Sequence, residues 1–348
     1  MKQITAVMFI FIAVILVIPS LLVVGFSNDD PVPVNTFSSE EDVPDLVVTD
    51  GEPMEEKVIS VFRTESETIE EVPLEEYIAG VVAREMDAAY EMEALKAQAL
   101  TARTYIINLL LMDSNLDLPD GADVLDTVQH QVYSNEEEMR ERWGTDFDWK
   151  MARIKQAVYE TQGQIITYNG EPITASFFST SNGFTENSEE YWTSEISYLR
   201  SVESPWDRES PRYEGEASFS VERFEHTLGV SLGDGSVGNV LSRTTGGRVA
   251  KIEIGGQEFT GREIRELLEL DSTDFTIERV GDVIEVETRG WGHGVGMSQF
   301  GAHGMAQEGF TYDQIIKHYY QGVEIQHADS FLGSLMAAEQ TEGEVTTP

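Results

Sequence analysis

The stretch PLEEYIAGVVAREMDAAYEMEALKAQALTARTY, residues 73–105, decides the fold of the first half of the chain. Its proline suits the first turn of a helix, and two glutamates follow near the positive end of the helix dipole. We therefore expect a helix over residues 73–86. Over residues 91–112 apolar side chains recur at three- and four-residue steps, which predicts a second, longer helix.

Outward from these helices the pattern changes along the chain. We expect a first strand at 58–62, a third helix at 149–161 and short helices at 261–270 and 311–320. After residue 163, β-branched and aromatic runs alternate with Asn-Gly, Gly-Gly and Gly-Asp turns. The strands predicted there are 164–168, 173–179, 218–221, 249–254 and 283–288. Because helices come first and strands later, the predicted class is α+β, with an N-terminal helical part and a β-rich part.

A glycine-rich stretch, RGWGHGVGMSQFGA (Arg289–Ala302), lies near the end of this region. Glycine is unfavourable inside helices and strands, so this density indicates positive φ angles or the close approach of another chain. A flexible linker would carry serine and polar residues instead of Trp, Val, Met and Phe. We therefore expect an ordered loop.

The chain of 348 residues is strongly acidic, with 63 Asp and Glu against 23 Lys and Arg and a formal net charge of −40. This balance argues against a nucleic acid partner, because phosphate binding needs a basic face. The acid excess is spread along the whole chain, which is typical of a surface adapted to salty or alkaline surroundings. The alternative, a cationic partner, has no local feature in its favour.

The N-terminal residues 4–26 are almost wholly apolar. As a helix they would span roughly 34 Å, enough to cross the core of a bilayer. Lys2 precedes them and acidic residues follow, so the positive-inside rule places the rest of the chain outside the cytoplasm. A cleaved signal peptide is the alternative, but its apolar core is usually shorter and ends in a small-x-small site. We expect an uncleaved anchor in the cell membrane.

Four parts of the chain are expected on this basis: a transmembrane anchor at 1–26, an acidic disordered tether at 27–57, a single extracytoplasmic domain at 58–330 and a flexible tail at 331–348. The tether is rich in proline, serine and acids and carries few aromatic residues, a composition that cannot bury a core. The tail lacks apolar periodicity and is expected to fray.

Several classes of chemistry have no support in the sequence. There is no cysteine, hence no disulfide, thiolate ligand or cysteine nucleophile. P-loop and H-E-x-x-H motifs are absent from the sequence. His293 and His303 lie close together in the chain, but a metal pair there lacks an obvious third ligand. We therefore expect neither a metal nor a cofactor.

One carboxyl stands out on the first expected helix. Tyr77, Val81 and Glu85 fall at four-residue steps and share a face, so Glu85 lies near apolar groups close to the helix end. A carboxyl in such surroundings has a raised pKa and can act as a general acid. The alternative is a surface glutamate paired with Arg84 or a lysine. Arg103, on the next helix, would pair with Glu85, bind an anionic substrate or form a structural ion pair.

Five blocks occur in order: PLEEYIAGVVAREM, EALKAQALTARTY, SFFSTSNGFTENSEEYW (Ser176–Trp192), YLRSVESPWD (Tyr198–Asp207) and GWGHGVGMSQFGAHGMA (Gly290–Ala306). Together they resemble the stage II sporulation protein D family of bacterial peptidoglycan lytic transglycosylases, to which amidase enhancers are related. The resemblance covers most of residues 60–325, and blocks of this length are highly specific.

The resemblance implies a substrate, a reaction and partners. Such enzymes cut glycan strands between N-acetylmuramic acid and N-acetylglucosamine and leave a 1,6-anhydro end. They prefer denuded glycan, whose stem peptides a partner amidase, stage II sporulation protein P, has removed; stage II sporulation protein M completes the complex. The complex remodels septal wall and drives forespore engulfment from the mother-cell membrane, facing the space around the forespore. The family's catalytic acid corresponds to Glu85.

The implied mechanism needs one carboxyl. The acid protonates the glycosidic oxygen through an oxocarbenium-like transition state. The resulting carboxylate then takes the proton from the muramyl C6 hydroxyl, which attacks its own C1. A hydrolase would normally need a second carboxylate at a defined distance, and the sequence shows no obvious acid pair near Glu85.

The sequence departs from the family's pattern at two places. Many members read E-M-P at the acid, whereas here E-M is followed by Asp87, a change expected to affect only how the helix ends. Some members bind zinc near a motif resembling C-D-x-x-H-C-Q-x-Y. Residues 125–133 read LDTVQHQVY, with Leu125 and His130 in the cysteine positions and Gln129 in the histidine position. We therefore expect no zinc.

Other polar residues of the blocks are candidates for binding sugar hydroxyls and acetamides, with loop-stabilising hydrogen bonds as the alternative. They are Gln98, Arg103, Ser181, Asn182, Thr185, His293 and Gln299. The glycine-rich stretch is expected to form a wall of the glycan groove, where Trp291 would stack on a sugar or anchor the core. The alternative function is a non-enzymatic, wall-binding amidase enhancer of the same fold, which would have no need of Glu85.

Overall fold

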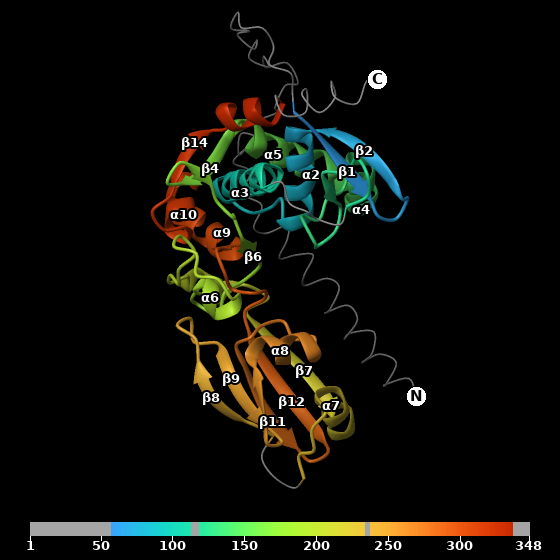
Figure 1. Ribbon diagram of the computed structural model, residues 1–348, viewed down its shortest axis with the longest axis vertical. Coiled ribbons are helices and arrows are strands. Elements are labelled where there is room, and N and C mark those ends of the chain that lie inside the picture. The colour runs from blue at the N-terminus through green and yellow to red at the C-terminus, as the bar shows by residue number, and fades with distance from the viewer. Residues whose placement is uncertain (1–56, 113–117, 234–236, 337–348) are drawn as a thin grey trace, which may run out of the picture. The chain divides into compact units, whose positions relative to one another are not determined.

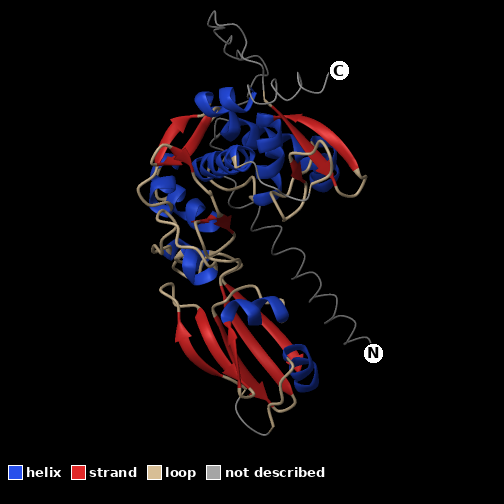
Figure 2. Ribbon diagram, in the orientation of Figure 1, coloured by secondary structure: helices blue, strands red, loops and turns tan. Residues whose placement is uncertain are grey.

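The computed structural model describes residues 57–112, 118–233 and 237–336. The α+β class is confirmed (Figure 2). The helices are α2 (Leu74–Glu85), α3 (Met92–Leu111), α4 (Glu136–Trp143), α5 (Phe147–Glu160), α6 (Ser188–Tyr191), α7 (Val221–Leu228), α8 (Gly261–Leu267), α9 (Gln299–Gln307) and α10 (Tyr312–Tyr319), with 3-10 turns η1 (Gly144–Asp146) and η2 (Pro205–Glu209).

The strands are short and belong to five small sheets. They are β1 (Val58–Arg63), β2 (Thr68–Pro73), β3 (Val124–Leu125), β4 (Gln164–Tyr168), β5 (Glu171–Pro172), β6 (Phe177–Phe178), β7 (Glu214–Ser220), β8 (Asn239–Arg243), β9 (Val249–Ile254), β10 (Gln257–Thr260), β11 (Phe275–Val280), β12 (Val283–Arg289), β13 (Met297–Ser298) and β14 (Glu324–His327). The strand orders are β2-β1-β3, β14-β4-β5, β13-β6, β10-β9-β8 and β11-β12-β7.

The first hydrophobic core is built around three helices. Figure 1 shows α2, α3 and α5 packed together, with the β1–β2 hairpin on one side and β4 with β14 on the other. Tyr77 and Val81 of α2 are fully buried in this core, as their four-residue spacing predicts. Pro73 precedes the first turn of α2, and Glu75 and Glu76 occupy that turn. The helix dipole therefore meets negative charge at its positive end.

A second hydrophobic core lies between two antiparallel sheets and two helices. Its residues run from Phe219 to Val286 and come from β7, α7, β9, β10, α8, β11 and β12. Strand β12 alternates buried and exposed residues, as expected for a sheet with one face on a core. Helix α8 begins with a capping box, in which Thr260 accepts from the Glu263 N–H and the Glu263 carboxylate accepts from the Thr260 N–H.

Polar contacts connect the segments around the two cores. Arg248, just before β9, forms a 2.9 Å ion pair with Glu186, and both side chains are 2% exposed. Asn182 donates to the carboxylate of Asp274 at 3.0 Å and to the carbonyl oxygen of Gly246 at 3.0 Å. The chain thus passes between the cores through buried hydrogen bonds and one buried ion pair.

Most expected elements are present, with shifted ends, but some expectations were wrong. The expected strand 173–179 contains only the two residues of β6, which pair in parallel with β13 of the glycine-rich stretch, and the Ser176 oxygen accepts from the Met297 N–H in this pairing. The expected loop ends earlier, since α9 begins at Gln299. The elements without a counterpart in the prediction are strands β2, β3, β5, β8, β10, β11, β13 and β14 and helices α4, α6, α7 and α9.

The ends of the chain give a mixed result. The expected anchor 1–26 lies outside the described residues, as does all but Lys57 of the expected tether. No helix within the described ranges is long and apolar enough to cross a membrane. Residues 329–336 are helical, and this helix includes the first six residues of the tail expected to fray at 331–348, because Phe331 and Leu332 pack against the first core.

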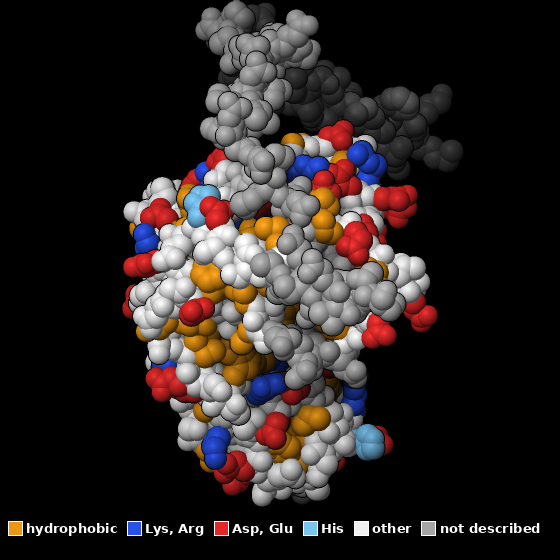
Figure 3. Space-filling view, turned by 45° about the horizontal axis from the view of Figure 1, so that its top comes forward, with side chains coloured by type: hydrophobic (Ala, Val, Ile, Leu, Met, Phe, Trp, Pro, Cys, Tyr) orange, Lys and Arg blue, Asp and Glu red, His pale blue; other side chains and the backbone are white. Residues whose placement is uncertain are grey.

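The acidic surface has no single focus on the face seen in Figure 3. Asp and Glu side chains are distributed over that face instead of forming one patch. This agrees with the even spread of acids along the sequence.

Candidate active site

Glu85 lines a cleft of about 420 Å³ that five segments of the chain enclose. The end of α2 and the α2–α3 loop form one part of its wall, and α4 and α5 contribute a second. The remaining lining comes from the segment after β6, from the segment after η2 and from the first residue of α9. The lining residues are Ala83, Arg84, Glu85, Met86, Asp87, Ala88, Tyr90, Arg142, Trp143, Lys150, Ser179, Thr180, Ser210, Pro211, Arg212 and Gln299.

The Glu85 carboxyl is half-buried at the last residue of α2. Burial raises the pKa of Glu85, while a hydrogen bond from the Val132 backbone N–H and the positive charge of Arg84 oppose this shift. Glu85 is therefore protonated more readily than an exposed glutamate. The protonated form is the one that a general acid needs. Arg84 forms no ion pair with Glu85 within 4.0 Å, so the alternative of a paired surface glutamate does not describe this site.

The loop that follows Glu85 is held from two sides. The Arg153 guanidinium of α5 donates to the carbonyl oxygens of Ala88 and Tyr90 at 2.8 and 2.7 Å. From α9, the His303 ring stacks on Tyr90 at 4.4 Å and its Nδ1 accepts from the Glu91 N–H. Met86 is extended, so α2 stops there, and this fixes the direction in which the Glu85 side chain leaves the helix.

Two of the predicted binding residues meet beside this cleft. Gln299 lines it, and its Nε2 donates to the Oε1 of Gln98 at 3.4 Å. Gln98 is fully buried, and its own Nε2 has no hydrogen-bond partner within the described part of the chain. Gln98 therefore orients Gln299 from behind, while Gln299 is the residue of the pair that can reach a ligand.

Arg103 has a structural role and does not pair with Glu85. It is fully buried, and its guanidinium forms a 2.6 Å ion pair with Glu75. The remaining donors go to the backbone carbonyls of Thr161, Gln164 and Val158. All five N–H groups of the side chain are thereby used. Of the three roles considered for Arg103, the structural ion pair is the one observed.

Ser181 belongs to a buried network centred on Asp207. The Asp207 carboxylate accepts from the hydroxyls of Ser181, Ser204 and Ser298 at 2.5–2.7 Å. Burial raises the pKa of Asp207, and these three donors oppose the shift. Because Ser298 also caps α9, the network fixes the helix that carries Gln299. The Ser181 side chain is fully buried and supports the loop that carries it.

Asn182, Thr185 and His293 are also engaged within the protein. Thr185 is fully buried, donates to the Arg200 carbonyl and accepts from the Val202 N–H. His293 lies among the rings of Phe178, Tyr191 and Trp192, and its Nδ1 accepts from the Val295 N–H. Burial lowers the pKa of His293 to about 4, so its ring is neutral near pH 7. Asn182 donates to Asp274. None of these three residues lines the Glu85 cleft.

The glycine-rich stretch is ordered, with positive φ at Gly290, Gly292, Gly294 and Gly296 as expected. The close neighbours of these glycines are protein groups: a Cβ at Gly294 would lie 2.8 Å from the Arg248 guanidinium carbon. Of this stretch only Gln299 lines the Glu85 cleft. The stretch therefore contacts mainly other parts of the protein. Its expected role as a wall of the groove applies to Gln299 alone.

Comparison with known proteins establishes the family. A family model described as stage II sporulation protein matches residues 63–168. Stage II sporulation protein D of Bacillus subtilis (strain 168) is 48% identical over 341 residues, which cover 97% of this chain and 99% of that protein. The chain belongs to the stage II sporulation protein D family. A protein of the same name from Bacillus amyloliquefaciens is 47% identical over 328 residues, or 93% of this chain and 95% of that protein.

The family's relation to amidase enhancers is also found. The amidase enhancer of Bacillus subtilis (strain 168) is 28% identical over 304 residues, covering 71% of this chain but only 40% of that protein. The chain therefore corresponds to less than half of that relative. The relation shows shared ancestry over that part.

In this member of the family, the segment compared with the zinc motif forms internal contacts. His130, in one cysteine position, accepts from the Leu125 N–H through Nδ1 at 3.3 Å. Among the described residues, no group of three or more His, Asp or Glu side chains could hold a metal ion.

Sequence reasoning missed the basic residues of the Glu85 cleft and one acid. Arg142 and Lys150 come from α4 and α5, and Arg212 from the segment after η2. None stands in one of the five blocks, so no motif pointed to them. Asp87, which was expected to affect only how the helix ends, also lines the cleft. Its Oδ1 accepts from the Ala89 N–H at 3.0 Å, so Asp87 shapes the turn after α2.

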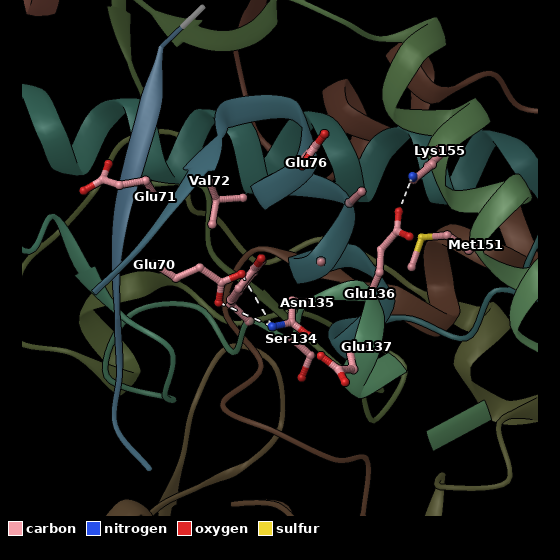
Figure 4. A pocket seen from close by; sticks show the side chains of 13 residues that line it. Glu70, Glu71, Val72, Glu76, Ser134, Asn135, Glu136, Glu137, Met151 and Lys155 are labelled. Atoms are coloured by element: carbon pink, nitrogen blue, oxygen red, sulfur yellow. Dashed lines mark hydrogen bonds and ion pairs between the residues drawn. The ribbon is translucent and has the colours of Figure 1, made fainter. Parts of the chain in front are cut away.

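A second hollow, of about 360 Å³, lies along the other part of α2, and its charged lining residues are five acids and one lysine. Figure 4 shows Glu70, Glu76 and Glu137 around it, with Lys155 paired to Glu136. The Asn135 side-chain amide donates to the Glu70 carboxylate at 3.5 Å. This composition matches the acidic chain as a whole, and it has no feature that indicates a ligand.

Proposed function

We propose that this chain is a lytic transglycosylase that cuts peptidoglycan glycan strands between N-acetylmuramic acid and N-acetylglucosamine and leaves a 1,6-anhydro end. The observation that carries the proposal is a half-buried carboxyl with a raised pKa, Glu85, in an open cleft of a member of this family. A cleft lined by polar side chains and one tryptophan suits a chain of sugars, whose faces are apolar and whose edges bear hydroxyls.

In the proposed reaction Glu85 acts twice. The protonated carboxyl gives its proton to the glycosidic oxygen as the bond to the muramyl C1 breaks and oxocarbenium character develops. The carboxylate then takes the proton of the C6 hydroxyl while that oxygen bonds to C1, which closes the 1,6-anhydro ring. The proton returns to Glu85, and no water is consumed.

Two other functions compete with this one. In a hydrolase, Asp87 would activate a water molecule while Glu85 acts as the acid, because two carboxylates in one cleft are what glycoside hydrolysis requires. In an amidase enhancer of the same fold, the cleft would bind wall without cutting it, as the relation to a protein of that name suggests. The hydrogen bond from Ala89 that Asp87 accepts supports a structural role for Asp87.

The proposal extends to the cellular setting. Residues 4–26 would anchor the chain in the mother-cell membrane, with the folded part facing the space around the forespore. Denuded glycan would be supplied by stage II sporulation protein P, and stage II sporulation protein M would complete the complex. Septal wall remodelling during engulfment is the process in which these partners would act.

The test uses the full-length chain, in detergent, on denuded glycan strands, with products analysed by mass spectrometry. The wild type is expected to release 1,6-anhydromuramyl ends. Glu85→Gln is expected to lower the release rate at least about 100-fold, the usual contribution of a general acid. Asp87→Asn serves as the matched control and is expected to keep most of the activity, because Asp87 has no part in the proposed steps.

The outcomes separate the three functions. Products with a reducing muramyl end, together with an inactive Asp87→Asn variant, would show a hydrolase. No cleavage by wild type, while a known transglycosylase cuts the same strands, would sink the enzymatic proposal in favour of a wall-binding protein. Thermal unfolding checks that Glu85→Gln folds: its Tm near pH 7 should equal or exceed that of wild type, because the variant no longer holds a partly buried carboxylate.

A further inference from the structure

The Glu85 cleft has an unusual charge for this chain. Four of its lining residues are cationic, Arg84, Arg142, Lys150 and Arg212, against two acids, Glu85 and Asp87. The whole chain has 63 acidic and 23 basic residues. The acidic hollow of Figure 4 follows that composition, whereas the Glu85 cleft reverses it. The reversal indicates that cationic side chains in this cleft have a specific partner outside the protein.

The cations of the cleft are poorly neutralised by the protein itself. In the described part of the chain, Arg84, Arg142 and Arg212 have no carboxylate oxygen within 4.0 Å, and Lys150 has one, on Asp146, at 3.7 Å. The Nε of Arg84 is buried and has no hydrogen-bond partner. Elsewhere, cations such as Arg63, Arg103 and Arg200 are held by one or more acids.

Aromatic faces position two of these cations without using up their hydrogen-bond donors. The Arg212 guanidinium carbon lies 4.9 Å from the ring centre of Trp291, and the Lys150 ammonium lies 5.5 and 5.4 Å from the rings of Trp143 and Trp149. A guanidinium stacked on a ring keeps its N–H edges free to bind a carboxylate with two parallel hydrogen bonds. Arg212 otherwise makes one long contact, 3.5 Å, to the Ser179 hydroxyl.

We propose that Arg84, Arg142, Lys150 and Arg212 form a carboxylate subsite beside Glu85. The inference rests on the proposed function, and on a glycan strand it identifies the ligand as the lactyl carboxylate of N-acetylmuramic acid. That carboxylate is free and negative where no peptide is attached, and it becomes a neutral amide where a stem peptide is attached. The subsite therefore distinguishes muramyl sugars by the state of their lactyl group, and it gives no such contact to N-acetylglucosamine, which lacks that group.

The same cations act on the chemistry only indirectly. A carboxylate bound beside Glu85 brings negative charge to the cleft, which favours the protonated form of the acid. Binding of the correct sugar thus raises the fraction of Glu85 that can donate a proton. Arg212 and Arg142 are specificity residues in this account, and Glu85 remains the catalytic residue.

Binding to the inactive, full-length Glu85→Gln chain tests the subsite. The probes are three tetrasaccharides: alternating N-acetylglucosamine and N-acetylmuramic acid with free lactyl groups, the same strand with its lactyl groups as methylamides, and an N-acetylglucosamine tetramer. The free-acid strand is expected to bind at least about tenfold more tightly than the methylamide strand, a modest effect for charge-assisted hydrogen bonds. The preference is expected to shrink as salt is raised, since partly exposed charges are screened.

Arg212→Gln and Arg142→Gln, each in the Glu85→Gln background, are expected to remove most of that preference by weakening binding of the free acid alone. Arg223→Gln is the matched control, because Arg223 also lies over an aromatic ring, that of Phe219, has no carboxylate within 4.0 Å among the residues that the structure describes, and is absent from the cleft. Asp87→Asn is expected to strengthen binding of the free acid, since it removes the neighbouring like charge.

Equal affinity for the free-acid and methylamide strands would overturn the subsite. A preference that survives both Arg212→Gln and Arg142→Gln would do so as well. Neither result touches the proposed function, which stands if wild type releases 1,6-anhydro ends from both strands. If wild type releases none from either strand, the proposed function fails, while the binding preference still decides whether the cleft recognises a carboxylate.

Discussion

At the scale of single residues, the setting of Glu85 decides its chemistry. The four-residue spacing from Tyr77 and Val81 directs its side chain toward the buried face of α2, and the end of the helix opens that face to a cleft. Burial favours the protonated acid, whereas Arg84 and the Val132 N–H favour the carboxylate. Glu85 must first donate a proton and then accept one, so both its protonated form and its carboxylate form must be accessible. The two opposed influences on its pKa keep both forms accessible.

The pH dependence of cleavage follows from these influences. The acid form starts the reaction, so the rate is expected to fall as pH rises above the raised pKa of Glu85. Arg84→Gln removes a charge that lowers this pKa, so the alkaline limb of the pH–rate profile should move to higher pH. Profiles of kcat/KM for wild type and Arg84→Gln on denuded strands check this. A limb that stays in place, or moves to lower pH, would show that another group controls it.

At the scale of elements, the glycine-rich stretch is a packing device. Gly296 has φ +82°, and a Cβ added there would lie 2.0 Å from the carbonyl oxygen of Ser176. That oxygen cannot move aside easily, because it accepts from the Met297 N–H at 3.1 Å and from the Tyr320 hydroxyl at 2.7 Å. β6 and β13 pair in parallel at this point and bring residues that are far apart in sequence into register.

Gly296→Ala is therefore expected to destabilise the protein strongly. The matched control is Gly309→Ala, since Gly309 has φ +90° but no atom within 4 Å of the added Cβ. The control should lose about 1–2 kcal/mol of unfolding free energy, the cost of a left-handed backbone with a side chain. Gly296→Ala should lose about 1–3 kcal/mol more, from overpacking. Denaturant unfolding measures both, and equal losses would contradict the importance of the contact with Ser176.

At the scale of the whole molecule, two hydrophobic cores are connected by buried polar groups. The Glu186–Arg248 pair is the most enclosed of these contacts, and Thr244 also donates to the Glu186 Oε1. Burial raises the pKa of Glu186, and Arg248 opposes the shift. The Arg248 guanidinium also donates to the Phe184 carbonyl oxygen at 3.0 Å, whereas Glu186 Oε2 and Arg248 Nε have no hydrogen-bond partner among the described residues.

Arg248→Met is expected to cost about 3–5 kcal/mol of unfolding free energy near neutral pH, because it leaves a buried carboxylate without its partner. The pKa of Glu186 would rise further, so the native state binds a proton that the unfolded state has lost, and the loss of stability grows as pH rises. The double variant Glu186→Gln/Arg248→Met should recover part of the loss. Lys251→Met, which breaks an exposed pair with Glu258, should change the free energy of unfolding far less, because solvent screens that pair. Urea unfolding at pH 5 and pH 8 measures all four chains, and a loss that does not depend on pH would contradict this account.

What could be predicted from the sequence depended on local pattern. Helices α2, α3, α5 and α10 follow from three- and four-residue apolar periodicity, and the position of Glu85 on α2 follows from the same spacing. The α+β class and the positive φ angles of the glycine-rich stretch were also within reach. Short strands such as β6, β8 and β13 were not, because their pairing partners lie far away in the chain and two to five residues carry too little pattern.

The sequence by itself therefore determined the family, the main helices and the position of the acid, since each depends on neighbours within one or two helical turns or on contiguous blocks. Only the tertiary structure decided which side chains share the cleft with that acid. Arg142, Lys150 and Arg212 reach it from segments 57 or more residues away. The tertiary structure also showed that Arg103, Ser181 and His293, predicted to bind the ligand, have structural roles instead. Burial and satisfied hydrogen bonds are properties of the folded packing, and no local pattern encodes them.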